Sequence, residues 1–460
     1  MTAPPRVVVL GAGVAGLYAA RILAEAGVDT LVLERAEVVG GLAAGRERGG
    51  NHYDFGVHLL HAQDPEVFGV LQAELGDLLR PVAKSAKIRY GRGFRRYPLR
   101  FLDVLAGIPL LELLHCLSGM AFQSVRNTLR PREPRDAEEA LIQLYGGPLY
   151  RSFFRDFTAH HWGLPASALS ATFVKQKMPR LSAVDGLKRV LGKLGLGKGQ
   201  VGGVESALGD ETLWYTERGC RSFGEALAAA VRRAGGRILL ESPATGFRWG
   251  AAGVESVRYQ AGGIDREVEC DFLVSTIPLP HLVRAAEPAA PSAVQASAAA
   301  LRFKPVAVYG LLVARPQVLD CLYVYFRNRI FHRVAEPTRS GLRVAQTGHT
   351  LLLAEITCDE GDSRWEGRED VRQQVVRDLV DEGLIEAAEV LEIHVFVNAH
   401  AYPMFSLGFE SHLDGIRNWL GGFANLRSVG RNGGFCYPNM HGAMQMGAAA
   451  ACDALAATRR

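Results

Sequence analysis

The fold of this chain is decided by the stretch Val7-Val8-Val9-Leu10-Gly11-Ala12-Gly13-Val14-Ala15-Gly16. An apolar run comes first, a glycine-rich turn of the pattern GxGxxG follows, and the turn leads into an amphipathic segment. A strand, a glycine turn and a helix in this order are typical of the unit that opens a dinucleotide-binding domain. The stretch therefore predicts an α/β fold that begins with a βαβ unit.

Each glycine of this turn has its own physical role. Gly11 permits the tight turn, Gly13 lets the backbone approach a pyrophosphate, and Gly16 lets the helix pack closely on the strand. The backbone N–H groups at the helix start, where Val14 and Ala15 lie, then face the phosphate charge. The turn is thus predicted to hold the phosphates of a dinucleotide.

A carboxylate follows at the spacing that such a site needs. The apolar run Thr30-Leu31-Val32-Leu33 ends in Glu34, which lies 18 residues after Gly16. The acid that binds a ribose hydroxyl lies about 20 residues after the glycines. Glu34 therefore favours a free ribose hydroxyl over a 2′-phosphate.

Further motifs resemble one large superfamily of flavoproteins. They are Val39-Gly40-Gly41-Leu42, Phe55-Gly56-Val57-His58-Leu59-Leu60-His61 and, near the end of the chain, Gly430-Arg431-Asn432-Gly433-Gly434 followed by Asn439-Met440. Together they are similar to the amine oxidases, protoporphyrinogen oxidases, phytoene desaturases and UDP-galactopyranose mutases. In that superfamily a Gly-Gly pair follows the ribose acid and runs beneath the FAD. The resemblance therefore implies noncovalent FAD, with Cys436 as the alternative for a covalent bond.

Two subgroups are mixed in this chain. The stretch 55–61 resembles the mutases, whereas Tyr215 to Leu227 resembles the protoporphyrinogen oxidases and desaturases and lacks the mutases' signature. The resemblance implies an FAD-dependent oxidoreductase that transfers a hydride between a small organic substrate and flavin N5. The alternatives are a redox-neutral isomerase of a nucleotide sugar and, last, a flavin-binding protein with a structural role.

The resemblance also implies which residues bind the cofactor. They are Gly11, Gly13, Val14, Ala15, Gly16, Glu34, Arg35, Gly40, Gly41, Leu42, Gly56, Val57, His58, Thr276, Gly430, Arg431, Asn439, Met440 and Ala443. In this reading Gly430 and Arg431 end a strand, and the helix after Asn439 begins beside the flavin ring. A positive helix end at that place would stabilise an anionic reduced flavin.

Three histidines are candidates for proton transfer, because the pKa of imidazole is near neutral. They are His58, His61 and His441, and the last stands where relatives usually carry an acid. The structural alternative is that nearby carbonyl groups, or solvent in the case of His441, simply satisfy each ring. Candidate substrate contacts are Lys177, Arg327 and Tyr437, with Lys175 and Arg180 as further cations that either clamp a diphosphate or lie solvated at the surface.

Composition fits a globular enzyme. The 460 residues are 48% hydrophobic and 22% charged, which is enough for two joined domains with large cores. A net charge of +4 gives no general drive towards nucleic acid. The seven cysteines are scattered without a CxxC pair, and the first strand begins near Arg6, so we expect reduced thiols and a cytoplasmic protein. No metal-binding spacing stands out.

The separated motifs predict two discontinuous domains. Residues 1–80, 215–285 and 421–460 would form the Rossmann-like FAD-binding domain, and residues 81–214 and 286–420 an α+β substrate-binding domain. Apolar and polar residues alternate in the stretches 306–313 and 350–356, which are therefore expected to be strands of the second domain.

Two segments of the predicted substrate domain stand out. Residues 101–125 are apolar and flanked by arginines, and Asp103, Glu112 and His115 argue against a spanning helix. The sequence favours a buried helix there, with peripheral membrane contact through residues 92–132 as the alternative. Residues 191–209, with repeated glycines and lysines, are expected to form a mobile surface loop or a lid.

Overall fold

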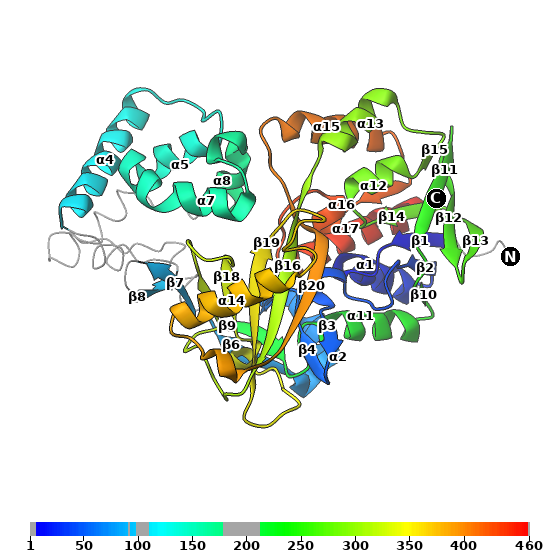
Figure 1. The fold of residues 1–460 in the computed structure, drawn as a ribbon. Coiled ribbons are helices and arrows are strands. Elements are labelled where there is room, and N and C mark those ends of the chain that lie inside the picture. Colours follow the sequence, from blue (N-terminus) through cyan, green and yellow to red (C-terminus); the bar gives the residue numbers. More distant parts are fainter. Residues whose placement is uncertain (1–5, 91–92, 98–109, 178–211, 459–460) are drawn as a thin grey trace.

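The structure is a computed structural model that describes residues 6–90, 93–97, 110–177 and 212–458 (Figure 1). The predicted opening unit is present: strand β1 (Arg6–Leu10), helix α1 (Val14–Glu25) and strand β2 (Asp29–Leu33) follow one another. The two strands pair in parallel, with Val9 opposite Val32. The α/β fold expected from the sequence is therefore confirmed.

The strands of the opening unit belong to a five-stranded parallel sheet. Its order is β10-β2-β1-β14-β21, and the three further strands are β10 (Arg237–Leu239), β14 (Phe272–Ser275) and β21 (Leu426–Ser428). Every neighbouring pair is parallel. The three central strands β2, β1 and β14 are largely apolar and buried, because a parallel sheet is covered on both faces.

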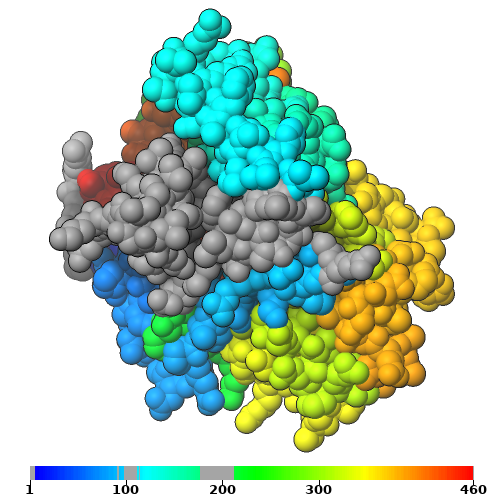
Figure 2. Space-filling model, turned by 90° about the vertical axis from the view of Figure 1, so that its left-hand side faces the viewer, coloured from blue at the N-terminus to red at the C-terminus, as the bar shows by residue number. Residues whose placement is uncertain are grey.

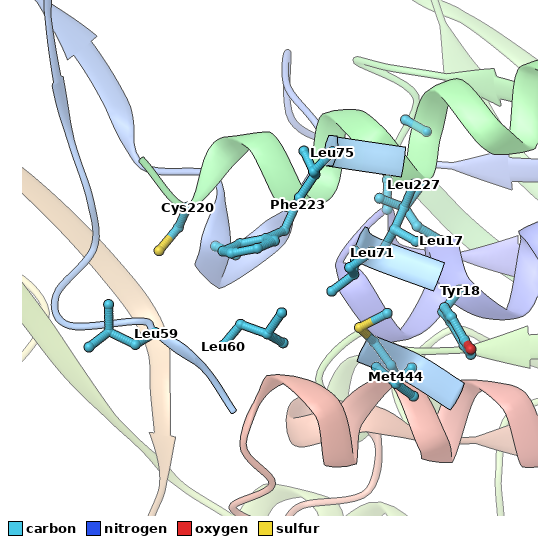
Figure 3. Close-up of a cluster of buried hydrophobic side chains, with 14 of the residues drawn as sticks. Leu17, Tyr18, Leu59, Leu60, Leu71, Leu75, Cys220, Phe223, Leu227 and Met444 are labelled. Carbon is cyan, nitrogen blue, oxygen red and sulfur yellow. The ribbon is translucent and has the colours of Figure 1, made fainter. Parts of the chain in front are cut away.

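Four helices enclose the apolar core beside this sheet. They are α1, α2 (Pro65–Leu75), α11 (Arg221–Arg233) and α17 (Met440–Thr458). Figure 3 shows Met444 of α17 close to Leu71 of α2 and Tyr18 of α1, with Phe223 of α11 above them. The N-terminal and C-terminal segments of the described chain thus share one core.

Smaller sheets adjoin the parallel one. One of them has the order β13-β12-β11-β15, in which β11, β12 and β13 pair as consecutive antiparallel strands. Its strands are β11 (Ala244–Gly250), β12 (Gly253–Ala261), β13 (Ile264–Glu269) and β15 (Ala286–Glu287), and α12 (Leu279–Arg284) and α13 (Ser292–Ala300) flank the last of these. Two further sheets are formed by β3 (Arg46–Arg48) with β4 (Asn51–Tyr53), and by β5 (Leu60–His61), β9 (Thr212–Thr216) and β6 (Leu79–Ala83).

A seven-stranded sheet forms the other wall of the molecule. Its order is β20-β16-β19-β18-β17-β7-β8, with β7 (Ala86–Tyr90), β8 (Gly93–Tyr97), β16 (Phe303–Val313), β17 (Tyr323–Tyr325), β18 (Arg333–Ala335), β19 (Thr350–Thr357) and β20 (Val390–Pro403). The two predicted strands are confirmed as β16 and β19. They alternate less than expected, because β19 is buried along its whole length. Helices α14 (Glu369–Asp381) and α15 (Phe409–Leu420) come from the same half of the chain.

A helical region stands apart from the parallel sheet, at the upper left of Figure 1. It contains α4 (Leu110–Leu129), α5 (Ala137–Tyr145), α6 (Gly147–Leu149), the π-helical turn η3 (Tyr150–Phe154), α7 (Arg155–Trp162) and α8 (Ala171–Lys177). In the described ranges, no helix is long and apolar enough to span a membrane.

Helix α4 corrects one expectation from the sequence. The sequence favours a buried helix over residues 101–125, yet the described part is largely exposed, with Leu111 at 82%, Phe122 at 68% and Leu129 at 75%. The physical reason is that α4 packs through a narrow face around Cys116 and Gln123 only. Residues 98–109, like the predicted loop 191–209, lie outside the described residues.

Candidate functional site

The glycine turn after β1 is shaped by close backbone contacts. Gly11 has a φ of +95°, and a β-carbon at Gly16 would lie 2.1 Å from the carbonyl oxygen of Gly11. At Gly13, by contrast, a β-carbon would meet no atom within 4 Å. Gly13 is the N-cap of α1 and has no side chain to cap the first turn. The helix start therefore faces open space and can receive an anion.

Glu34 lies beside this turn. Its carboxylate accepts hydrogen bonds from the backbone N–H of Ala12 at 2.7 Å and of Ala36 at 2.9 Å. These contacts fix the carboxylate next to the glycine turn, where the predicted ribose ligand has to be. Arg35, the next predicted contact, is exposed.

The Gly-Gly pair packs against the same turn. The N–H of Gly40 donates to the carbonyl of Ala12 at 2.8 Å, and a β-carbon at Gly41 would lie 3.1 Å from the Cα of Gly13. Both glycines have positive φ, +108° and +59°, which an L side chain rarely adopts. The short helix η1 (Gly41–Ala43) that follows brings Leu42 to the edge of a pocket.

The C-terminal motif reaches the turn from the other side. A β-carbon at Gly430, with a φ of +79°, would lie 3.1 Å from the β-carbon of Ala15. At Gly447 a β-carbon would lie 2.2 Å from the carbonyl oxygen of Ala15. The predicted contact Thr276 lies on the same side, since its Oγ1 is 2.5 Å from where a β-carbon of Gly11 would be. The structure thus brings both ends of the predicted site together.

One detail of the C-terminal motif differs from the prediction. Gly430 and Arg431 do not end a strand but lie in the short helix α16 (Gly430–Gly433), after β21 has ended at Ser428. The left-handed φ of Gly430 turns the chain out of the sheet at this point. Helix α17 then begins at Met440, and the carbonyl of Asn439 accepts the N–H of Ala443 at 2.9 Å.

A small pocket, partly open to solvent, lies between these motifs and the seven-stranded sheet. It is lined by Leu42, Phe55, His58, Val306, Val308, Asn398, Ala401, Tyr402 and Arg431. Strand β16 supplies the two valines and strand β20 supplies Asn398, Ala401 and Tyr402. The pocket is therefore mainly apolar with four polar groups, the composition typical of a small-molecule or cofactor site.

The loop that carries His58 is anchored by a buried carboxylate. Asp54 accepts hydrogen bonds from His52 Nε2 at 2.9 Å, from the N–H of Cys220 at 3.0 Å and from the hydroxyl of Tyr215. Burial would raise the pKa of Asp54, but these donors hold it below its usual value. The thiol of Cys220 also donates to the carbonyl of His58 at 2.6 Å. The hydrogen bonds of Asp54 and Cys220 thus hold the loop that carries His58 in place.

His58 is a neutral imidazole at physiological pH. Burial, and next the positive charge of Arg431, lower its pKa to about 4. Its Nδ1 is shielded from solvent and has no hydrogen-bond partner among the described residues. Asn432 Oδ1, in the C-terminal motif, is shielded and unsatisfied in the same way. Buried polar atoms are nearly always paired, so these two atoms fit a site completed by a bound ligand.

Arg431 is the cation of the pocket. Its Nη2 donates to the carbonyl of Pro438 at 3.1 Å, which bends residues 431–438 into a loop. Burial lowers the pKa of Arg431, and the ring hydroxyl of Tyr402 opposes this effect. Even so, a guanidinium remains charged in a protein.

A second arginine lies behind the Gly56 turn. Arg333 of β18 forms a bidentate ion pair with Glu355 of β19, in which Nε and Nη2 each lie 2.6 Å from a carboxylate oxygen. Burial would lower the pKa of Arg333, but Glu355 raises it well above its ordinary value. A β-carbon at Gly56, whose φ is +112°, would lie 2.9 Å from the Glu355 carboxyl. The pair therefore supports the turn that leads to His58.

The other two candidate histidines lie together rather than in the pocket lining. The rings of His61 in β5 and His441 in α17 are 5.8 Å apart, edge to face. Asp64 lies near His441, and hydrogen bonds from the N–H of Val67 and from Gln445 hold the pKa of Asp64 below its usual value. His58 is thus separated from His61 and His441, and only His58 contacts the pocket.

The predicted substrate contacts are dispersed. Arg327 donates to the carbonyl of Ser152 at 2.7 Å and lies over the rings of Tyr90 and Phe153. Tyr437 donates to the carbonyl of Pro403 and packs against Phe405, Tyr402 and Trp162. Lys175 pairs with Glu133 at 3.1 Å in solvent, Lys177 ends α8 without a described side chain, and Arg180 lies outside the described residues.

Sequence reasoning missed several groups of this site. Asn398 and Tyr402 lie on a long strand with no motif, and Arg333 and Glu355 are separated by 22 residues without a recognisable pattern. Asp54 is the exception, because an acid beside the quoted glycine stretch could have been singled out. All seven cysteines are free. Within the described ranges, no cluster of His, Cys, Asp and Glu is placed to hold a metal.

Comparison with known proteins agrees with this geometry. The model of the flavin-containing amine oxidoreductase family matches residues 14–455. The 15-cis-phytoene desaturase of Arabidopsis thaliana is 42% identical over 74 residues, 16% of this chain and 13% of the desaturase. The probable UDP-galactopyranose mutase of Klebsiella pneumoniae is 24% identical over 193 residues, 39% of this chain and 46% of the mutase. Each match thus spans less than half of the relative's length.

Solved structures share the fold over the whole chain. A reduced UDP-galactopyranose mutase superposes with a TM-score of 0.79 at 18% identity, covering 99% of this chain and 94% of the other. Cyclohexylamine oxidase from Brevibacterium oxydans IH-35A gives 0.65 at 14% identity, with 100% of both chains covered. With the cradle of glycines, Glu34 and the converging C-terminal motif, these matches lead to one conclusion. The chain belongs to the family of flavin-containing amine oxidoreductases, and its cofactor is FAD.

Proposed function

We propose that this protein is an FAD-dependent oxidoreductase that transfers a hydride between the flavin and a small organic substrate. The observation that carries the proposal is the pocket where Leu42 after the Gly-Gly pair, Arg431 of the C-terminal motif and strand β16 meet. In such enzymes FAD supplies the hydride chemistry. The protein binds FAD, orients the substrate and excludes water from the site. We therefore assign the residues of this pocket to those tasks.

The residues divide into an apolar wall and a polar side. Val306 and Val308 of β16 form the wall, which keeps water from a reacting centre. Arg431 supplies a positive charge that would stabilise the negative charge gained on reduction. The neutral His58 can donate or accept one hydrogen bond, or accept a proton from a substrate.

Anaerobic spectroscopy of the purified flavoprotein tests this proposal. Primary and secondary amines, alcohols and other small reductants would be mixed with the oxidised enzyme while flavin absorbance is followed. We expect at least one class to bleach the flavin in a saturable manner. Arg431→Met should slow this reduction by about tenfold to a hundredfold while FAD stays bound. Arg427→Met changes a partly exposed arginine that pairs with Asp453; it is the matched control and should react as the wild type does.

A second candidate is a redox-neutral isomerase that acts on a nucleotide sugar. It is favoured by the partial sequence match to the Klebsiella mutase and by Arg327, a cation enclosed by aromatic rings that could bind a diphosphate. UDP-galactopyranose would be incubated with dithionite-reduced and with oxidised enzyme. Conversion only by the reduced enzyme, with no net change in flavin redox state, supports the isomerase. Bleaching by a substrate without isomerisation supports the oxidoreductase, and a preparation without extractable FAD would contradict both.

A further inference from the structure

Helix α4 has its apolar face turned away from the protein. Leu111, Leu114, Phe122, Val125 and Leu129 are between 54% and 82% exposed, and we call these five side chains the outer face of α4. Their spacing of three, eight, three and four residues places them on one side of a helix with 3.6 residues per turn. A soluble surface helix normally shows the opposite arrangement.

The packed side of α4 is the more polar one. Gln123 is only 7% exposed and bonds to Asn127, which in turn donates to the carbonyl of Gln143 in α5 at 2.9 Å. Gly119 lies against Pro148, so closely that a β-carbon would be 2.5 Å from the proline ring. The orientation of α4 is therefore fixed by specific contacts, and the outer face cannot simply rotate inwards.

The concentration of exposed apolar groups on α4 is unusual in this molecule. Eleven large hydrophobic side chains are exposed among the described residues, and five of them form the outer face of α4. The other six are spread over the remaining elements: Val38, Leu78, Ile264, Val380, Leu391 and Leu407. Scattered apolar residues are ordinary, whereas a contiguous apolar patch marks a surface that another apolar phase covers.

The charge around this face favours an anionic occupant. Residues 110–132, which include α4, contain three arginines and one acidic residue. Arg126 and Arg130 are exposed at the end of α4 and have no ion pair with the described residues, whereas Arg132 pairs with Glu139. Two copies of this segment would repel each other, but an anionic lipid surface would attract it.

We propose that the outer face of α4 docks the protein on anionic lipid bilayers as a peripheral, non-spanning contact. The helix extends about 30 Å at 1.5 Å per residue and lies at the periphery of the fold (Figure 1). Figure 2 shows the cyan region of α4 at the top of the face turned to the viewer. Leucine, phenylalanine and valine would enter the acyl boundary, and Arg126 and Arg130 would contact the headgroups. This proposal does not depend on which reaction the flavin site performs.

Vesicle flotation of the FAD-loaded protein tests the proposal. We expect wild type to float with vesicles of phosphatidylcholine and phosphatidylglycerol, less with phosphatidylcholine alone, and less in high salt. Leu111→Gln/Phe122→Gln/Leu129→Gln should weaken binding at least about tenfold, because three apolar side chains no longer enter the bilayer. Arg126→Gln/Arg130→Gln should lower affinity for the anionic vesicles only.

A matched control distinguishes binding through the outer face of α4 from nonspecific hydrophobic binding to the vesicles. Ile264→Gln/Leu391→Gln/Leu407→Gln removes three exposed apolar side chains from other elements and should leave flotation unchanged. FAD content and thermal unfolding of both triple variants should equal those of wild type, since all six positions are exposed.

A local readout checks that α4 itself enters the lipid. Phe122→Trp should give a blue-shifted difference emission with anionic vesicles, quenched by brominated acyl chains. No flotation, or flotation unaffected by the α4 variants, would overturn the proposal. So would a lipid-free dimer, seen by sedimentation velocity and dissolved by the α4 triple variant, because the occupant would then be a second copy of the chain.

Discussion

Arg333 and Glu355 form a bidentate ion pair in the interior of the seven-stranded sheet, with both nitrogen–oxygen distances at 2.6 Å. Glu355 is only 1% exposed, and its carboxyl lies against Gly56, two residues before His58. Strands β18 and β19 thus connect a buried charge pair directly to the loop that forms the pocket. Because neither charge can be solvated alone, the pair couples the stability of the sheet to the geometry of the site.

The first prediction concerns this pair. Glu355→Gln should lower the free energy of unfolding by about 3–5 kcal/mol, because it leaves the Arg333 guanidinium buried without its counter-charge. The double variant Arg333→Met/Glu355→Leu should lose clearly less, since neither partner of this pair is then left buried with an uncompensated charge. Urea unfolding followed by circular dichroism gives both values. Equal losses in the single and double variants would contradict this interpretation.

Two glycines of the first turn should behave differently. Gly16→Ala should impair folding, because its β-carbon would lie 2.1 Å from the Gly11 carbonyl oxygen. In Gly13→Ala the new β-carbon would meet no atom within 4 Å. This variant should leave the stability of the apoprotein within about 1 kcal/mol of wild type. If Gly13 faces the pyrophosphate as predicted, the same variant should bind FAD at least about tenfold more weakly. Titration of the apoprotein with FAD, monitored by flavin fluorescence, measures this. Unchanged affinity would place the phosphates elsewhere.

Acid should destabilise the protein through its buried histidines. The pKa of His58 is about 4 in the fold, and burial lowers that of His400 to about 4 as well, against an ordinary value of about 6.5. Between these values the unfolded chain binds protons that the folded chain does not, so stability falls as pH falls from 6.5 towards 4. The slope of the free energy of unfolding against pH should be smaller in His58→Gln by about 1.4 kcal/mol per pH unit, which corresponds to one proton.

The slope would be measured from urea unfolding at several pH values with excess FAD. His115→Gln, at an exposed position of α4, is the matched control and should leave the slope as in wild type. A slope in His58→Gln equal to that of wild type would show that the imidazole of His58 is accessible to protons in the folded state.

Precipitation of the protein with acid should release its flavin into solution. Burial raises the pKa of the Cys436 thiol, and its sulfur lies 3.6 Å from the carbonyl oxygen of Gly430 and 3.9 Å from the sulfur of Met446. A protonated thiol held among these groups is a poor nucleophile. FAD should therefore remain in the supernatant, in wild type and in Cys436→Ala alike. A yellow pellet that is lost in the alanine variant would demonstrate a covalent bond.

Local features of the sequence specify the opening βαβ unit and its glycine turn. Four apolar residues, a GxGxxG turn and an amphipathic helix are local features, so their conformation follows from steric limits and side-chain periodicity over about 20 residues. The resemblance of the two distant motifs placed them in one site, and the close contacts of Gly430 and Gly447 with Ala15 confirm that they meet.

Contacts between distant parts of the chain determine which side chains share the pocket and which face of α4 is covered. Tyr402 and Asn398 reach the pocket through the register of β20 on β16, and a register is set by pairings between residues far apart in the chain. The sequence likewise could not show that His58 lies in the pocket while His61 and His441 lie together outside it, because contacts between distant residues place these side chains. In α4, apolar residues occur on more than one side, so periodicity could not tell which side packs. The contacts of Gly119 with Pro148 and of Asn127 with α5 determine which side of α4 packs against the protein.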